Sequence, residues 1–240
     1  MDKEMFFTEI TKNAEIINEH ITQKQSDDLF KYMKLLIEWN NKINLTAITD
    51  ENEIILKHFI DSITINKYLK GKKSVLDIGT GAGFPGMPLK ILNTDINFTL
   101  ADSLNKRIIF LEEVCKELNL KNIRCIHGRA EELGNNEKYR EKYDVVTSRA
   151  VAKLNVLLEY MLPFVKVGGE CICMKGPNIK EEIDEINSAL KVLGGEIKKI
   201  ENMVLPNSDN ERNIIVIEKI AHTPSKYPRK AGVPSKQPLI

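Results

Sequence analysis

Residues 75–91 read VLDIGTGAGFPGMPLKI and contain the transition that decides the fold. An apolar strand, Val75 to Ile78, runs directly into a loop with glycines at 79, 81 and 83, and an apolar helix pattern begins after Pro85. Glycines at this spacing let the chain turn tightly and let a ligand approach the backbone with no Cβ between them. In an open α/β sheet, the carboxyl end of the first strand is where ligands bind.

The sequence after this stretch alternates between strands and helices, which predicts a parallel sheet with right-handed crossovers. Two further strands follow without a helix between them and are joined by the loop Pro206–Asn210, which predicts an antiparallel hairpin at the sheet edge. The predicted strands are residues 74–78, 97–101, 123–127, 143–147, 169–174, 196–204 and 213–218; the clearest helices between them are 106–118, 154–162 and 179–193. We therefore expect an α/β, Rossmann-like, doubly wound and mostly parallel sheet with an antiparallel C-terminal hairpin.

The two ends of the chain have a different character. The first seventy residues read as helices, with capping-box patterns at Thr22–Gln25 and Asp50–Glu53. The last residues are rich in proline and in basic side chains and predict an irregular segment. The expected divisions are a helical N-terminal segment (1–71), a Rossmann-like domain (72–220) and a basic C-terminal tail (221–240) that packs on or near it.

The composition excludes few functions. The 240 residues are 42% hydrophobic, enough for a substantial core, and the net charge of +1 argues neither for nor against a nucleic-acid partner. Four cysteines show no CxxC spacing and predict buried free thiols in a reducing compartment, with no metal site. The N-terminus lacks a signal-peptide layout, and no apolar run approaches the roughly 18 residues of a membrane span. We expect a cytoplasmic monomer without membrane contact.

The glycine loop allows two readings. Gly81 to Gly86 matches GxGxxG, a weak indication of a dinucleotide site, but Pro85 would interrupt the helix that should open there. In the other reading Asp77 ends the strand, and Gly79, Gly81 and Gly83 follow it directly. A carboxylate repels a pyrophosphate but tolerates the cationic sulfonium and ammonium groups of S-adenosylmethionine. This register therefore favours S-adenosylmethionine over NAD, with Asp77 and the three glycines as contacts.

Two later strands end in further candidate ligands of such a nucleoside. Asp102 lies about twenty residues past the loop, where a carboxylate accepts hydrogen bonds from ribose hydroxyls. It could equally cap the helix that begins near Asn105. After the third strand, the backbone of Ala130 and Glu131 lies where an adenine would be held, although Glu131 could also be an ordinary first-turn helix charge.

With these residues in hand, the chain resembles the RsmG (GidB) family, bacterial methyltransferases that act on N7 of a guanine in 16S ribosomal RNA. The resemblance implies a class I methyltransferase fold, S-adenosyl-L-methionine as cofactor, and the small-subunit ribosomal RNA or the 30S subunit as partner. It further implies cofactor contacts at Gly79, Phe84, Ala130, Glu131 and Arg149. The motifs that carry it are Trp39-Asn40, Asn44-Leu45-Thr46, His58-Phe59, Asp61-Ser62, DIGTGAGFPG (77–86), Arg129-Ala130-Glu131, Ser148-Arg149-Ala150, Met174-Lys175-Gly176 and Arg229-Lys230 with Gly232 and Pro234.

The residues after the fourth strand and the positions of the cysteines argue against two other classes of methylation target. By elimination, they agree with guanine N7. The residues after the strand read Ser148-Arg149-Ala150, not the Asn/Asp-Pro-Pro-aromatic motif of enzymes that methylate exocyclic amines. None of the four cysteines follows a proline, as the nucleophile of pyrimidine carbon-5 methyltransferases typically does. Guanine N7 has its own lone pair and no proton to lose, so catalysis there is mostly positioning and electrostatics.

Candidate side chains for positioning and for RNA binding follow from the same pattern. Arg149 and Lys175, at the ends of two strands, could clamp the methionine carboxylate or a phosphate. Arg229, Lys230 and Lys236 in the tail have no acid among them and predict an RNA contact, unless they are merely a solvated surface.

Three residues of the motifs are expected to be structural. His58 lies on an apolar helix face and is more often a satisfied structural histidine than a catalyst. Asn40 and Asn44 are expected to satisfy the backbone of their connector. Two alternatives stay open at this point: a small-molecule methyltransferase on the same fold, and a NAD-dependent or nucleotide-binding protein.

Overall fold

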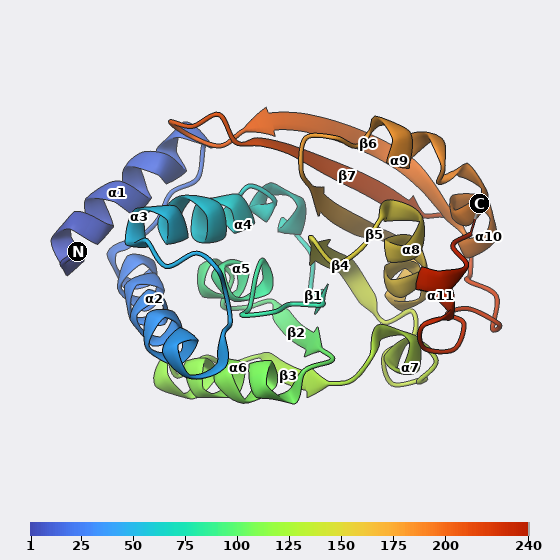
Figure 1. The fold of residues 1–240 in the computed structure, drawn as a ribbon, viewed down its shortest axis with the longest axis horizontal. Helices are drawn as coiled ribbons and strands as arrows, with labels where there is room; N and C mark the ends of the chain where they lie inside the picture. The colour runs from blue at the N-terminus through green and yellow to red at the C-terminus, as the bar shows by residue number, and fades with distance from the viewer. Residues whose placement is uncertain (240) are drawn as a thin grey trace.

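The computed structural model describes residues 1–239 and is built on a seven-stranded sheet with the order β3-β2-β1-β4-β5-β7-β6 (Figure 1). The first five strands pair in parallel, and β7 pairs antiparallel with both β5 and β6. The doubly wound sheet and its closing hairpin are therefore as predicted. The strands are β1 (Ser74–Ile78), β2 (Asn97–Asp102), β3 (Ile123–His127), β4 (Tyr143–Arg149), β5 (Val165–Lys175), β6 (Gly195–Val204) and β7 (Glu211–Lys219).

Five strands are longer than the sequence pattern indicates, and the extensions of β4 and β5 change the description most. Strand β4 continues to Arg149, so this side chain belongs to the strand end itself. Strand β5 begins at Val165, which pairs with Tyr143, and the register then shifts before Glu170 pairs with Val145. Gly168 adopts φ +83° within this irregularity, a conformation that glycine adopts without steric cost. Gly168 and Gly169 thus mark an irregularity inside the strand, whereas the sequence pattern predicts that the strand begins at residue 169.

Helices cover both faces of the sheet. Residues on alternate positions of the strands pack into two separate clusters, one with α8 and α10 and the other with η2 and α5. The helices and helical turns are α1 (Lys3–Ile16), α2 (Gln23–Ile43), α3 (Glu51–Ile54), η1 (Ile55–Ile60), α4 (Asp61–Ile63), η2 (Asn66–Leu69), α5 (Gly86–Leu92), α6 (Asn105–Glu117), α7 (Ala130–Gly134), α8 (Leu154–Met161), η3 (Leu162–Phe164), α9 (Lys180–Asp184), α10 (Asn187–Leu193) and α11 (Val233–Lys236). None of those in residues 1–239 is long and apolar enough to cross a bilayer.

The N-terminal helices share a core with the rest of the chain. One continuous cluster joins Phe6 of α1 and Tyr32 of α2 to Phe84 of the glycine loop and to Leu100 of β2. The predicted capping boxes at the starts of α2 and α3 are both borne out in their main contact: Thr22 accepts from the Gln25 amide and Asp50 from the Glu53 amide. The helices of residues 1–71 therefore pack directly against the glycine loop, α5 and α6 (Figure 1).

The helix predicted over 179–193 is divided. Helices α9 and α10 are separated at Glu185 and Ile186, and this break lets Ile179 and Ile186 both pack into the cluster around α8. The C-terminal tail is mostly irregular, as predicted, but ends in the short helix α11, which lies beside α8 (Figure 1).

Candidate functional site

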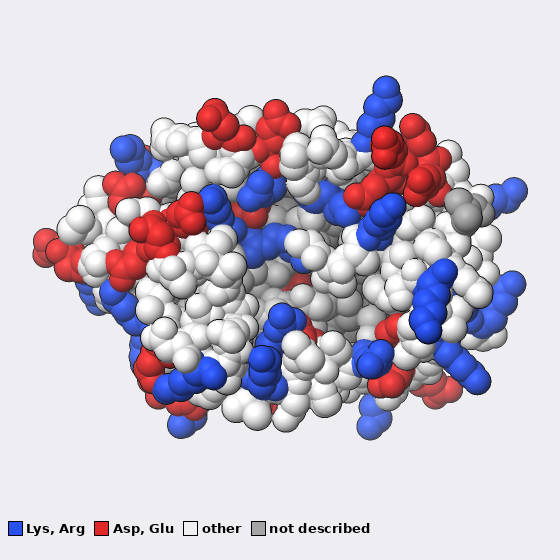
Figure 2. Space-filling model, viewed as in Figure 1, with Lys and Arg blue, Asp and Glu red and all other residues white. Residues whose placement is uncertain are grey.

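A cavity of about 700 Å³ lies at the carboxyl ends of β1, β4 and β5, where the strand order reverses. Its walls come from the glycine loop, from the connector after α2, from η1 and from the start of β7. A second cavity of about 260 Å³ adjoins it, and Gly79, Asp102, Ser103 and Val151 line both. The two together form an elongated site, and Figure 2 shows the hollow at the centre of this face.

The glycine loop is fixed by hydrogen bonds to the neighbouring strand. The backbone amides of Gly79 and Thr80 both donate to the carbonyl of Ala101, and the Gly81 amide donates to Asp102 Oδ2 at 2.9 Å. Gly83 adopts φ +106°, and a Cβ there would lie 2.6 Å from the Tyr32 hydroxyl. Gly79 and Gly81 line the larger cavity, whereas Gly83 packs against the α2 helix and does not line it. Of the three predicted contacts, Gly83 thus has a packing role in this structure.

Asp77 lies beneath the loop and not in either cavity. Its side chain is fully buried, and Oδ2 accepts hydrogen bonds from Thr80 Oγ1 at 2.6 Å and from the Gly86 amide at 2.9 Å. Burial raises the pKa of Asp77 to about 6, against the opposing effect of these hydrogen bonds. The expectation that Asp77 touches a cofactor does not agree with this placement, because its carboxylate is used to shape the loop.

Asp102 ends β2 and faces both cavities. Its Oδ1 accepts from the Leu104 amide at 2.9 Å, and Oδ2 accepts from Gly81 and from Arg107 Nη1 at 3.1 Å. Asp102 thus stabilises the start of α6, as one of its two sequence-based interpretations expects. It also lines both cavities, and its contact with a ribose stays a prediction.

The smaller cavity holds the predicted adenine region. Ala130 and Glu131, at the start of α7, line it together with Tyr160 of α8. Glu131 is nearly buried, and its Oε1 accepts from the Gly232 amide of the tail at 3.0 Å. The tail therefore forms part of the support of this cavity, a contact for which the sequence had no signal.

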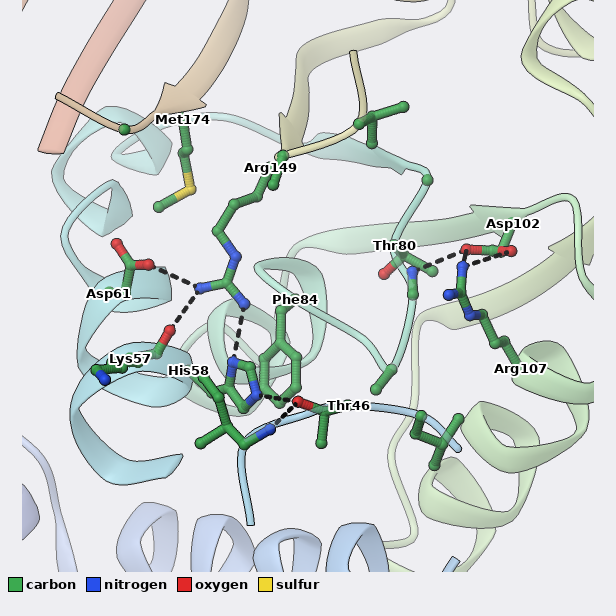
Figure 3. Close-up of a pocket in the computed structure, with 18 of the residues that line it drawn as sticks. Thr46, Lys57, His58, Asp61, Thr80, Phe84, Asp102, Arg107, Arg149 and Met174 are labelled. Carbon is green, nitrogen blue, oxygen red and sulfur yellow. Dashed lines mark hydrogen bonds and ion pairs between the residues drawn. The ribbon is translucent and has the colours of Figure 1, made fainter. Parts of the chain in front are cut away.

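Arg149 is held by three partners on the N-terminal helices (Figure 3). Its Nη1 donates to Asp61 Oδ2 at 3.0 Å and to the Lys57 carbonyl at 3.1 Å, and its Nη2 donates to His58 Nδ1 at 3.3 Å. The guanidinium also lies over the Phe84 ring, 5.2 Å from its centroid. Arg149 lines the larger cavity as predicted, but in a fixed position.

His58 and Phe84 form a stacked pair in the wall of the cavity. Their rings are 4.3 Å apart and inclined by 13°, and Tyr32 stacks on Phe84 at 5.5 Å. Burial, and then the charge of Arg149, lower the pKa of His58 to about 3, so the ring is neutral at physiological pH. His58 Nε2 lies 2.9 Å from Thr46 Oγ1, which also accepts from the Ile48 amide. Phe84 is thus occupied by protein partners and lines the cavity with little exposed surface.

The connector after α2 behaves as the sequence indicates. Asn40 Oδ1 accepts from the amides of Leu45 and Thr46, at 2.6 and 2.8 Å. Asn44 closes α2 in a left-handed conformation, φ 49°. Both asparagines satisfy the backbone as expected, and they place Thr46 at the cavity wall.

Four residues of the site had no site role predicted from the sequence. Arg212 of β7 donates from Nε to both oxygens of Asp61 at 3.2 Å, so that Asp61 pairs with two arginines. Arg107 pairs with Asp102, and Thr46 pairs with His58. Asp61 and Thr46 stand in motifs of the family, which is the one signal that the sequence offers; Arg212 and Arg107 become visible only in three dimensions.

The basic residues predicted to contact RNA fall into two groups. Lys175 lines the larger cavity, donating to the Ala152 carbonyl at 2.9 Å and pairing with Glu182 at 2.8 Å. Lys230 and Lys236 are exposed on the tail. Arg229 differs from the prediction: it makes a bidentate pair with buried Glu159 of α8, at 2.6 and 2.9 Å, so its guanidinium is directed into the protein.

The larger cavity is more basic than the whole chain. Five basic side chains line it against two acids, an excess of three, while the net charge of the chain is +1. The five are Lys57, Arg107, Arg149, Lys175 and Arg212; the acids are Asp61 and Asp102. Basic side chains surround the hollow in Figure 2, and such a concave site attracts an anionic partner. In residues 1–239, no three His, Cys, Asp or Glu side chains are grouped as a metal site would require.

Comparison with solved structures shows which fold this is. The structure of M. jannaschii TYW2 in complex with AdoMet matches with a TM-score of 0.52 at 16% identity, covering 67% of this chain and 77% of that one. A SAM dependent methyltransferase from Aquifex aeolicus matches with a TM-score of 0.51 at 18% identity, covering 70% and 93%. The fold is that of class I methyltransferases.

Sequence relatives are much more similar and extend over nearly the whole chain. A Ribosomal RNA small subunit methyltransferase G from Alkaliphilus oremlandii is 55% identical over 96% of this chain and 97% of its own. One from Lactobacillus johnsonii is 46% identical over the full length of both. Residues 25–215 also match the family described as GidB, rRNA small subunit methyltransferase G. The chain therefore belongs to the rRNA small subunit methyltransferase G (GidB) family.

Proposed function

We propose that this protein transfers the methyl group of S-adenosylmethionine to N7 of a guanine in small-subunit ribosomal RNA. The observation that carries the proposal is the elongated pair of cavities at the strand ends, lined by Asp102 and bordered by an excess of basic side chains. One end suits a nucleoside, and the other is open to an anionic polymer.

The residues present fit the cofactor. Asp102 would accept from its ribose, the start of α7 at Ala130 and Glu131 would hold its adenine, and the backbone at Gly79 and Gly81 would face its methionine part. Asp102 would accept from the ribose of NAD as readily, so the preference for S-adenosylmethionine rests on the glycine-loop register and on the family. When bound, S-adenosylmethionine supplies an electrophilic methyl group on a sulfonium.

The side chains of the larger cavity would position the cofactor and the RNA, and they would not accept a proton from the substrate. His58 is neutral, and both its ring nitrogens have partners; Asp61 is occupied by Arg149 and Arg212. The third candidate base that lines this cavity, Asp102, accepts from the Gly81 and Leu104 amides and from Arg107, so none of the three is without a partner. This matches a nucleophile such as guanine N7, which attacks with its own lone pair and loses no proton. Arg149 and Lys175 would orient the methionine carboxylate or a phosphate.

The experiment that tests the proposal is mass mapping of small-subunit RNA from cells with and without the protein, combined with calorimetry on the purified chain. We expect one N7-methylguanine to depend on the protein, and binding of S-adenosylmethionine and its demethylated product but not of NAD. Asp102→Ala should weaken cofactor binding by about 1–3 kcal/mol, the cost of a lost hydrogen bond to a charged acceptor. Lys236→Ala, on the exposed tail, is the matched control. Binding of NAD alone, or a methyl group on another base, would contradict the proposal.

We further propose that the protein acts as a cytoplasmic monomer on the RNA of the assembled 30S subunit. The supporting observation is that basic side chains gather around the hollow in Figure 2, which suits an RNA partner. Light scattering will report the oligomeric state. Methylation of purified subunits, compared with naked RNA, will report the substrate; faster reaction of naked RNA would contradict this part.

A further inference from the structure

Thr46 has an unusual set of hydrogen-bond partners at the wall of the larger cavity. Its Oγ1 accepts from the Ile48 amide at 3.1 Å and lies 2.9 Å from His58 Nε2 (Figure 3). A hydroxyl has one donor hydrogen and accepts through two lone pairs. The direction of the contact with His58 therefore decides what Thr46 offers to a ligand in the cavity.

Arg149 decides the proton position on His58. A guanidinium has donors only, so the contact from Arg149 Nη2 requires Nδ1 of the imidazole to be the acceptor. The ring is neutral, because burial and the charge of Arg149 lower the pKa of His58 to about 3. Its single N–H must then be at Nε2, which donates to Thr46. The Lys57 carbonyl accepts from Arg149 Nη1 and has a second lone pair, so it does not decide the tautomer. The assignment follows from the contact of Arg149 Nη2 with Nδ1, in which the guanidinium can only donate.

Both lone pairs of Thr46 Oγ1 are therefore engaged, and its own hydrogen remains free for the cavity that it lines. We propose that Thr46 is a dedicated hydrogen-bond donor that reads O6 of the target guanine and so rejects adenine. This inference rests on the proposed function. Guanine presents the acceptors N7 and O6 on one edge, whereas adenine presents a donor amino group in place of O6. A hydroxyl with no accepting capacity left cannot satisfy that amino group.

The reaction is compatible with a contact at O6. The N7 lone pair forms the new bond to the methyl carbon, the electrons of the carbon–sulfur bond go to sulfur, and the guanine ring gains a positive charge without moving a proton. As that charge develops, O6 becomes a poorer acceptor, so the contact with Thr46 is strongest before the transfer. Its loss should appear mainly as a higher KM for RNA, with a smaller effect on kcat.

The test combines variants of Thr46 with a change in the substrate. Thr46→Val keeps the shape and removes the hydroxyl, and Thr46→Ser keeps the hydroxyl. The RNA carries at the mapped position either guanine or 2-aminopurine, which has N7 but no O6. On guanine RNA we expect Thr46→Val to lose about tenfold in kcat/KM, the loss of one hydrogen bond of this kind. Thr46→Ser should stay within about threefold of the parent, well under the cost of a lost bond. On 2-aminopurine RNA the parent and Thr46→Val should react equally.

Two controls separate this inference from its alternatives. Affinity for S-adenosylhomocysteine and the melting temperature should be the same for the parent and Thr46→Ser. Nitrogen NMR of histidine-labelled parent protein, with His58 assigned through His58→Gln, should show the Nε2–H tautomer, a readout that holds even if Thr46→Val does not fold.

An equal loss by Thr46→Val on both RNAs, or the Nδ1–H tautomer in the parent, would overturn the inference and leave the proposed function intact. Absence of N7 methylation by the parent enzyme on guanine RNA would instead overturn the proposed function, and this inference with it.

Discussion

Asp77 and Asp102 are both carboxylates at strand ends, but their surroundings give them different roles. Asp102 faces the cavities and is satisfied by two amides and Arg107. Asp77 is sealed beneath the glycine loop, and its Oδ1 has no hydrogen-bond partner among the described residues. Its raised pKa follows from that burial, since an ionised carboxylate without full compensation is costly there.

Asp77 should make stability depend on pH in a direction unusual for an aspartate. Its pKa is about 6 in the folded protein against an ordinary value of 3.8, so the unfolded chain ionises first. As pH rises from about 4 to 6, the folded state loses up to about 3 kcal/mol from this group relative to its stability at low pH. Asp77→Asn removes the titration and keeps an oxygen for Gly86.

The measurement is the free energy of unfolding by urea at several pH values for both proteins. The difference in the free energy of unfolding between the two proteins cancels the contributions of all other titrating groups. From about pH 4 to pH 6, the stability of the variant relative to the parent should increase. A difference that does not change between pH 4 and 7 would contradict the assignment.

At the scale of elements, the tail and α8 form one unit. Arg229 donates to Glu159 from its backbone amide and from its guanidinium, and the carboxylate of Glu159 is buried. Pro228 packs against Gly134 of α7, and its carbonyl accepts from Asn135. Together with the contact between Gly232 and Glu131, these bonds hold the tail along the smaller cavity.

Removing Arg229 should therefore affect folding and the cofactor more than RNA binding. Arg229→Ala leaves the Glu159 carboxylate buried without its cation, at a cost of about 3–5 kcal/mol. We expect a clear drop in melting temperature and weaker binding of S-adenosylmethionine. Lys230→Ala, at the adjacent exposed position, is the matched control and should change neither. Equal stability of the two variants would show that the pair is dispensable.

The π-helical segment η1 is a second element that no local pattern predicts. It places the Lys57 carbonyl, the His58 ring and, one residue beyond it, Asp61 against Arg149. Such wide turns are rare and occur frequently at functional sites. His58 and Asp61 are three residues apart and lie on one face of this helical stretch, so both side chains contact the one guanidinium.

At the scale of the whole molecule, charge is distributed so that a nearly neutral protein has a basic hollow. The five basic side chains of the larger cavity are each paired with an acid or fixed by one, so RNA must compete for them. The exposed Lys230 and Lys236 on the tail carry no such partner in the structure of residues 1–239.

Neutralising those two lysines should lower the salt dependence of RNA binding. The slope of log affinity against log salt concentration should fall by up to about 2 units, because each phosphate contact contributes about 0.7–0.9. Cofactor affinity should not change. Lys12→Ala/Lys116→Ala, the same change of charge on α1 and α6, is the control and should leave the slope as it is. Parallel slopes for all three proteins would mean that the tail lysines are solvated and that RNA binds elsewhere.

The strand–loop–helix unit at 74–92 could be predicted from the sequence, as could the alternation of strands and helices, the closing hairpin and the family. These depend on short-range features: periodicity, glycine spacing and motifs within a few residues of one another. For the same reason Gly79, Gly81, Asp102, Ala130, Glu131, Arg149 and Lys175 were correctly placed at the strand ends, since strand order alone brings those ends together.

The contacts among the charged and polar side chains could not be predicted from the sequence and are seen only in the folded chain. Asp61 and Arg212 are 151 positions apart, and Arg229 and Glu159 are 70 apart, so no local pattern links them. The same holds for Asp77, whose burial depends on the packing of α5 over its strand, and for Thr46, whose donor role depends on His58 and Arg149. Pairing of this kind follows from which elements become neighbours, and that is set by burying the apolar faces of the whole chain.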